Sequence, residues 1–339
     1  EVIEIAKDYA EFGNFGYGKP SPALTELVIE RMDKLHDWRI QPNWLVWLPG
    51  MVCGFNVAIR AIGNEGDEVL SNIPVYPPFL TAPGNFGQNL VRVPMPLEGD
   101  RHTIDYDALE TAVSPRAKTF LFCHPHNPVG TQFTHAELER FADFCLRHDL
   151  IVCSDEIHCD LLLDEGSTHI PLAAIASEIA DKTITLMSPS KTFNLPGFGC
   201  SFAIISNPEL RLRYKKACAG IVPDPPAMGF TLAEAAYRHG EPWRQRLLLY
   251  LRANRDLALS RLGAISGLFP FPVSATYLLW IDARGLAVEN PQKFFEEAGV
   301  GLSDGTDFGS PGFLRLNLGC TRALLEQALD RMEQAVGAR

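Results

Sequence analysis

Between Trp44 and Ile205, short apolar runs of strand type alternate with stretches that have a helical pattern. The apolar runs cover residues 44–48, 68–71, 90–93, 119–123, 150–154, 183–187 and 200–205. Short runs that are apolar throughout are typical of strands buried on both faces of a parallel sheet. Because parallel neighbours need a crossover connection, the helical stretches between the runs predict a doubly wound, mostly parallel sheet. The expected fold class is therefore α/β.

After about Asn207 the pattern changes, because helical stretches dominate. Helices are expected at residues 208–219, 230–237, 242–262, 291–298 and 321–336, and strands at residues 271–281 and 312–318. This order of elements predicts a smaller α+β domain. We expect the two domains to pack closely, with a cleft between them.

Composition excludes several classes of protein. The chain has 339 residues, 46% of them hydrophobic, and a formal net charge of −11, which argues against nucleic acid or an anionic membrane surface as a partner. No apolar run has the length of a membrane span. The eight cysteines are scattered without a CxxC pair, which favours reduced thiols and a cytoplasmic location. Because the sequence begins at Glu1 and not at Met, we expect that upstream residues were removed or lie outside it.

Three of the apolar runs end in polar clusters. In chain order the clusters are His124-Pro125-His126-Asn127, Asp155-Glu156-Ile157-His158 and Ser188-Pro189-Ser190-Lys191. The carboxyl ends of parallel strands share one edge of the sheet, and ligands bind at that edge in open α/β folds. We therefore expect Asn127, Asp155 and Lys191 to converge.

Together these three side chains suit pyridoxal 5'-phosphate. An amine such as Lys191 can form an imine with an aldehyde, a carboxylate such as Asp155 can keep a pyridine nitrogen protonated, and the amide of Asn127 can bond a ring hydroxyl. The phosphate needs backbone donors at a helix start, which the segment 50–54 between a strand and a helix would supply. Ser188 and Ser190 would add hydroxyl donors.

Each residue alone also has a plainer interpretation. Asn127 beside Pro128 is a common turn former, and Asp155 could cap a helix or lie at the surface. His158 could pack beneath the site without touching a cofactor. An acidic pair such as Asp155-Glu156 can also bind a metal, but no second cluster has ligand spacing. The functional interpretation rests on the shared sheet edge.

The ordered set of motifs resembles the fold-type I pyridoxal-phosphate enzymes of the aminotransferase class I/II superfamily. It consists of His126-Asn127-Pro128-Val129-Gly130, Ser154-Asp155-Glu156-Ile157-His158 and Ser188-Pro189-Ser190-Lys191. Three of its features resemble the MalY/PatB branch, the cystathionine β-lyase type of C–S lyase. They are the Asp-Glu-Ile-His form, the continuous run from Ser188 to Asn194, and Val75-Tyr76-Pro77-Pro78-Phe79. The resemblance runs from about Phe15 to the C-terminus. It implies a large cofactor-binding domain over residues 14–245 and a small α+β domain from residues 1–13 and 246–339.

The resemblance also implies roles for single residues. Lys191 would bind the cofactor aldehyde and act as acid and base, and Tyr76, otherwise an ordinary core tyrosine, would stack on the ring. Arg315, otherwise a strand-edge arginine, would bind the substrate α-carboxylate, and Tyr17 would reach the phosphate of a neighbouring subunit in a homodimer. The remaining cofactor-binding residues implied are Val52, Cys53, Asn127, Asp155, His158, Ser188 and Ser190.

The implied activity is cleavage of cystathionine or related cysteine S-conjugates to pyruvate, ammonia and a thiol. Two alternatives stay open, an aminotransferase on the same fold and a regulatory protein that keeps the fold and binds a partner. Two departures from the wider family matter. Gly199 stands where many aminotransferases have a phosphate-binding arginine. The lyase branch also lacks this arginine. That branch has a Trp-Val-Ala-Asp-Met-Asp-Phe-like segment that lines the substrate entrance, and nothing like it occurs in this sequence. Two alternatives follow: the segment precedes Glu1, or it is absent and substrate binding differs from that of the branch.

Overall fold

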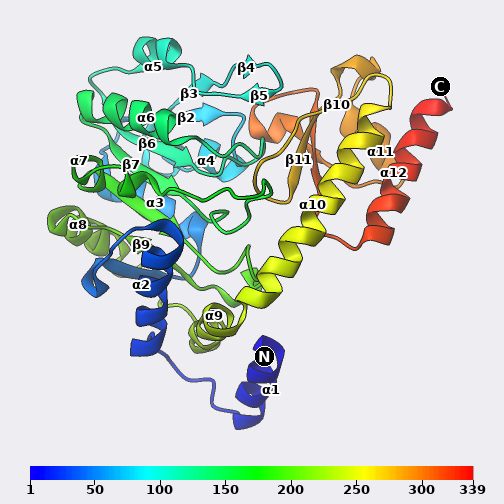
Figure 1. The fold of residues 1–339 in the computed structure, drawn as a ribbon. Coiled ribbons are helices and arrows are strands. Elements are labelled where there is room, and N and C mark those ends of the chain that lie inside the picture. The colour runs from blue at the N-terminus through cyan, green and yellow to red at the C-terminus, as the bar shows by residue number, and fades with distance from the viewer. Residues whose placement is uncertain (339) are drawn as a thin grey trace.

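The computed structural model describes residues 1–338 and contains a seven-stranded sheet with a four-stranded sheet beside it (Figure 1). The larger sheet has the order β1-β9-β8-β7-β6-β2-β3. The strands β3, β2, β6, β7 and β8 run parallel to one another, whereas β9 is antiparallel to both of its neighbours, β8 and β1. In sheet order the bounds are Leu45–Leu48, Ser201–Ile204, Thr183–Met187, Ile151–Asp155, Ala117–Cys123, Glu68–Ile73 and Asn89–Pro94. The predicted α/β fold with a mostly parallel sheet is confirmed.

Helices cover both faces of this sheet because successive side chains of each strand point to opposite sides. In β6, Leu121 and Cys123 face a core that contains α3 (Met51–Ile62) and α8 (Pro208–Cys218). Phe120 and Phe122 face a second core with α5 (Tyr106–Ala112) and α6 (His135–Arg147). Helices α2 (Pro22–His36) and α9 (Ala227–His239) pack around β9. The sheet is thus buried on both faces, as its apolar strands predict.

Helix α6 begins with a capping box. Thr134 Oγ1 accepts the Glu137 N–H at 3.3 Å, and Glu137 Oε2 accepts the Thr134 N–H at 2.7 Å. These two bonds satisfy donors that a helix start leaves unpaired. Arg101 of the short strand β5 (Arg101–His102) holds the same carboxylate at 2.6 Å, which ties the start of α6 to the two-stranded sheet of β5 and β4 (Leu97–Glu98).

The smaller sheet is antiparallel throughout, with the order β10-β11-β13-β12. Its strands are Phe269–Pro270, Leu278–Asp282, Phe313–Asn317 and Ser303–Asp304, and the helices α10, α11 and α12 pack on it. These helices are Glu241–Gly263, Pro291–Glu297 and Arg322–Gly337. The ring of Trp280 stacks on Phe313 in the core that also holds α6, so the two sheets are joined by apolar contact.

The expected strand at residues 271–281 is only partly correct, because residues 271–277 are not in a strand. The backbone N–H groups of Ser274, Ala275 and Thr276 bond to loops of the larger domain, whereas the Phe271 N–H still donates to Trp280 of β11. The N–H groups of Ser274 and Ala275 donate to the Gly130 carbonyl at 3.1 and 3.0 Å, and Thr276 has a φ of 71°. Gly130 itself has a φ of +67°, and a Cβ there would lie 2.6 Å from Val273. This close contact draws the smaller sheet toward the polar loop after β6.

Helix α1 (Val2–Phe12) lies beside α9 at the edge of the larger layer (Figure 1). Its residues Val2, Ile5 and Ala6 pack against a core formed by the segment after Lys191 and by α9. The division into residues 14–245 and residues 1–13 with 246–339 stays a prediction. The bounds of the remaining helices are Pro77–Thr81 (α4) and Ser177–Ala180 (α7). Within residues 1–338, no helix combines the length and the apolar composition that a membrane span needs.

Candidate active site

The carboxyl ends of β6, β7 and β8 lie at one level of the larger sheet. Cys123 is opposite Asp155 in the register, and Asp155 is opposite Leu186. The N–H of His124 donates to the Asp155 carbonyl, and the N–H of Glu156 donates to the Leu186 carbonyl, each at 2.9 Å. The three polar clusters predicted from the sequence therefore start side by side.

They open into a cavity of about 440 Å³ that both layers line. Eight of the eleven predicted site residues line it, namely Val52, Tyr76, Asn127, Asp155, His158, Ser190, Lys191 and Arg315. The structure thus brings together an amine, an acid, an amide and a guanidinium from distant parts of the sequence.

Three predicted residues do not line this cavity. Ser188 faces the chain, because its Oγ accepts the Ser190 N–H at 3.1 Å and donates to the Cys200 carbonyl at 2.7 Å. Cys53 is half-buried and its side chain packs against the core under α3. Tyr17 is fully exposed in the segment that joins α1 and α2. Its expected contact involves a neighbouring subunit, so the position within one chain does not test it.

Asp155 is the buried acid at the end of β7. Burial raises its pKa to about 7, and the nearby Glu156 carboxylate adds to this, whereas the bond from the Ile157 N–H and the charge of Lys191 oppose it. The Ile157 bond measures 3.2 Å. A buried carboxyl with only one weak donor favours the neutral form unless a cation lies against it. A protonated pyridine nitrogen would be such a cation, so this acid fits the predicted cofactor.

Glu156 points away from the cavity and fixes the loop. It accepts hydrogen bonds from Ser154 Oγ at 2.7 Å and the Leu172 N–H at 3.2 Å, and its Oε2 lies 2.7 Å from His169 Nε2. All of these groups are buried. Because three partners hold the Glu156 carboxylate, its position is fixed, and the adjacent Asp155 is held with it.

Arg315 reaches the cavity from β13 of the smaller sheet. Its guanidinium donates to Asn127 Oδ1 at 3.0 Å and to Ser303 Oγ at 3.3 Å, and lies 4.6 Å from the centre of the Phe308 ring. Burial lowers its pKa. None of the ion pairs among residues 1–338 includes Arg315, so its charge lacks a carboxylate partner within the described chain. A half-buried arginine of this kind suits a carboxylate ligand.

The first turn of α3 forms one wall of the cavity. The helix begins at Met51, so most of the segment 50–54 that the sequence placed before the helix forms its first turn, and Gly54 lies inside it. A Cβ on Gly54 would lie 3.1 Å from Leu48 and from Leu186, so glycine lets the helix pack closely on the sheet. No side chain caps the first turn. Its free N–H groups and the helix dipole suit an anion such as a phosphate.

Beside the start of α3, the cavity wall contains Gly199 and Ser201, and Ser201 is opposite Leu48 in the register of β1 and β9. Gly199 has a φ of +59°, and a Cβ there would lie 3.0 Å from the Pro49 carbonyl oxygen. This position therefore favours glycine and supplies no arginine for a phosphate. Ser201 was not predicted, although it directly follows Cys200 at the start of a predicted strand.

Aromatic rings close the sides of the cavity. His158 is buried, and burial together with the charges of Lys191 and Arg315 lowers its pKa to about 3, so the ring is neutral. It lies edge-on to Tyr277 with 5.9 Å between ring centres. Tyr76 is half-buried at the start of α4, and burial raises its pKa.

Sequence reasoning missed three lining residues of the smaller domain, namely Tyr277, Leu278 and Asn317. Asn317 had a readable signal, because it lies two positions after Arg315 on the same strand and therefore on the same face.

Comparisons with known proteins agree with this geometry. The family model described as aminotransferase class I and II matches residues 1–332. Cystathionine beta-lyase PatB of Bacillus subtilis is 34% identical over 347 residues, which cover 99% of this chain and 88% of that protein.

Two solved structures have nearly the same fold as this chain. A crystal structure of OvoB has a TM-score of 0.98 and 46% identity, covering 100% of this chain and 89% of the other. Cystalysin from Treponema denticola, which contains pyridoxal 5'-phosphate, has a TM-score of 0.95 and 31% identity, covering 99% and 87%.

Proposed function

Because the chain belongs to the aminotransferase class I and II family, we propose that it is a pyridoxal-phosphate-dependent C–S β-lyase. It would cleave cystathionine or related cysteine S-conjugates, with one water, to pyruvate, ammonia and a thiol. The observation that carries this proposal is the convergence of Lys191, Asp155, Asn127 and Arg315 on one cavity. The curated relative named as a cystathionine beta-lyase supports the reaction class.

The residues of the cavity fit the cofactor group by group. Lys191 would hold the aldehyde carbon, Asp155 the ring nitrogen and Asn127 the ring hydroxyl, while Tyr76 would stack on the ring. The first turn of α3 at Val52, with Ser190, would hold the phosphate. Bound there, pyridoxal phosphate supplies an electron sink that makes the Cα proton of an amino acid acidic. His158 would pack against the ring system as a neutral group.

Lys191 would carry the proton transfers. Its amine would remove the Cα proton of the substrate. The electron pair of the Cα–H bond would then form a Cα=Cβ double bond, and the pair of the Cβ–S bond would leave with sulfur. The lysine would return the proton to the departing thiolate. Burial raises the pKa of Asp155, so this acid needs a cation beside it to stay ionised. The protonated ring nitrogen of the cofactor would be that cation.

Arg315 would bind the substrate carboxylate by two parallel N–H bonds. Its present bonds to Asn127 and Ser303 aim the guanidinium into the cavity. Binding would therefore replace two neutral acceptors, Asn127 Oδ1 and Ser303 Oγ, with the charged carboxylate of the substrate. A substrate that carries a carboxylate is then favoured over an amine without one.

The residues of the cavity do not specify the group that the substrate carries on its sulfur atom. Identity to the OvoB structure is 46%, higher than the 34% to the cystathionine β-lyase of Bacillus subtilis, so cystathionine need not be the preferred substrate. The assay therefore needs a panel of cysteine S-conjugates with alkyl, aryl and amino-acid substituents.

The experiment measures pyruvate from each conjugate with the holoenzyme, with and without 2-oxoglutarate. A lyase forms pyruvate at the same rate in both mixtures. Product that appears only with 2-oxoglutarate, as glutamate and the matching oxo acid, would make the protein an aminotransferase. Lys191→Ala is the control, and turnover by that variant would end the assignment of the lysine.

Assembly and location are further parts of this proposal. A homodimer in which Tyr17 contacts the phosphate of the partner would give this fully exposed side chain a role. The eight cysteines are all free thiols, which supports a cytoplasmic location.

A further inference from the structure

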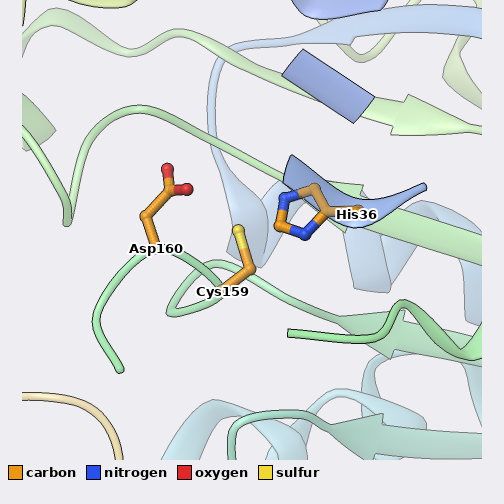
Figure 2. A group of neighbouring side chains, drawn as sticks. All are labelled: His36, Cys159 and Asp160. Atoms are coloured by element: carbon orange, nitrogen blue, oxygen red, sulfur yellow. The ribbon is translucent and has the colours of Figure 1, made fainter. Parts of the chain in front are cut away.

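A second group of reactive side chains lies behind the loop that carries Asp155. It comprises His36 at the end of α2 and Cys159 and Asp160, which follow His158 (Figure 2). One ligand atom from each lies within 4.8 Å of the other two. The three residues are 7%, 6% and 6% exposed, so they are buried although none lines the cofactor cavity.

The imidazole of His36 has a fixed tautomer. Its Nδ1 lies 3.2 Å from the carbonyl oxygen of His169, and only an N–H can bond to a carbonyl. In a neutral imidazole the other nitrogen, Nε2, then carries the lone pair. This Nε2 is buried and has no hydrogen-bond partner among residues 1–338. Histidines that bind metals typically donate their other ring N–H to a carbonyl in this way.

Asp160 offers one weakly engaged oxygen. Its Oδ1 accepts a 2.7 Å bond from Arg31, whereas its Oδ2 has only a 3.4 Å contact with Thr192 Oγ1. Arg31 also lies 3.6 Å from Glu241, so the guanidinium keeps a second counter-charge if the aspartate binds a cation. Figure 2 shows the carboxylate, the thiol and the imidazole side by side on two segments of the chain.

All three residues line a cavity of about 260 Å³, which leaves space for water beside them. A tetrahedral zinc ion at about 2.0–2.3 Å from nitrogen, oxygen and sulfur would place these atoms roughly 3.3–3.8 Å apart. The observed spacing therefore requires side-chain movements on the order of 1 Å, within the reach of rotamer adjustment.

We propose that His36 Nε2, Cys159 Sγ and Asp160 Oδ2 form a binding site for a borderline divalent cation of the Zn²⁺ class, with water as the fourth ligand. An imidazole, a thiolate and a carboxylate are the ligand types that this class prefers. Binding breaks the S–H bond of Cys159, forms a metal–sulfur bond and releases the proton to solvent. The site is independent of the proposed lyase function.

Proton release provides a sharp test. An unbound thiol has an ordinary pKa of about 8.5 and carries its proton at pH 7, whereas an imidazole lone pair and a carboxylate bind a metal without losing a proton. Tag-free holoenzyme is first freed of metal with a chelator. It is then titrated with ZnCl₂ in weak buffer containing a pH indicator, while calorimetry or a chromophoric chelator measures binding. We expect one zinc per chain and about one proton released per zinc.

The variants His36→Gln and Cys159→Ser should each weaken zinc binding at least about tenfold, and Cys159→Ser should also abolish the proton release. The matched controls are His148→Gln and Cys320→Ser, a histidine and a cysteine outside the cluster, and both should bind as the parent does. Equal binding by all four variants, or no saturable binding by the parent, would overturn the site.

A measurement on the unmodified protein guards against a variant that fails to fold. Co²⁺ replaces Zn²⁺ in such sites, and a thiolate ligand gives a charge-transfer absorption in the difference spectrum against metal-free holoenzyme. The site predicts this absorption at one equivalent of Co²⁺. Saturable Co²⁺ binding without it would exclude Cys159 as a ligand and contradict the proposal.

Discussion

Replacing Asp155 with asparagine removes the buried acid without changing its shape, and the cofactor-free protein should then lose one specific pH dependence. In the folded chain the pKa of Asp155 is raised from 3.8 to about 7. Between pH 3.8 and about 7, the Asp155 carboxyl therefore carries a proton in the folded state but not in the unfolded state. Stability from this group is fully present below pH 3.8 and is lost as the pH rises through about 7.

The size of the effect follows from the shift. A difference of roughly 3 pKa units corresponds to about 4 kcal/mol in the free energy of unfolding, at about 1.36 kcal/mol per unit. At pH 5 about 2 of these units remain, so the loss between pH 5 and pH 8.5 is about 3 kcal/mol. The amide of the Asp155→Asn variant would not titrate, and the neighbouring Glu156 and the buried histidines contribute to both proteins alike.

The assay is urea unfolding of the two cofactor-free proteins at pH 5 and pH 8.5, followed by tryptophan fluorescence. The parent should lose about 3 kcal/mol more than Asp155→Asn over this range. Adding pyridoxal phosphate to the parent should reduce the loss, because a pyridinium cation would hold the carboxylate ionised. An equal change in parent and variant would refute the assignment of Asp155 as an unpaired buried acid.

Three further changes have separable outcomes. Arg315→Lys should lower kcat/KM at least about tenfold, mainly through KM, because an ammonium cannot make the two parallel bonds of a guanidinium, and an unchanged KM in steady-state assays would contradict this. Tyr17→Phe should weaken cofactor affinity about fivefold, from one lost hydrogen bond of about 1 kcal/mol, and equal affinity in cofactor titrations would exclude the contact with the partner. Thr134→Ala should cost about 1 kcal/mol in urea unfolding through the lost cap of α6 while kcat stays constant, and a change in kcat would show that α6 influences the site.

Local patterns in the sequence predicted the sheet and one side of the site. Each cluster follows a strand buried on both faces, and the edge rule for parallel strands then places Asn127, Asp155 and Lys191 together. This inference needs no knowledge of helix packing. It therefore held even where helix and strand ends moved, as at Met51 and at Asp155, which is the last residue of β7 and not the first of a loop.

The contributions of the smaller domain were harder to predict because long-range contacts determine them. Tyr277 reaches the cavity because the Gly130 carbonyl accepts bonds from Ser274 and Ala275, a contact between segments more than 140 residues apart. Ser188 lies in the predicted cluster and its hydroxyl donates to the Cys200 carbonyl, so its contact with a phosphate stays a prediction. Arg315 was placed by resemblance alone, and its bond to Asn127 has no local signal in the sequence.

The same limit applies to the cluster of His36, Cys159 and Asp160. Cys159 and Asp160 are adjacent in sequence, but His36 lies more than 120 residues earlier on α2, with no ligand spacing to mark it. Only the packing of α2 against the loop after β7 brings the imidazole to the thiol.

The central claim is that the Lys191 amine holds pyridoxal phosphate in the cavity formed by the three strand ends. Reduction of the holoenzyme with borohydride converts an imine to a stable amine, and mass spectrometry of a digest then locates the label. We expect one phosphopyridoxyl group per chain, on the peptide that contains Lys191. A label on another lysine, or none on a protein that still forms pyruvate, would contradict the account.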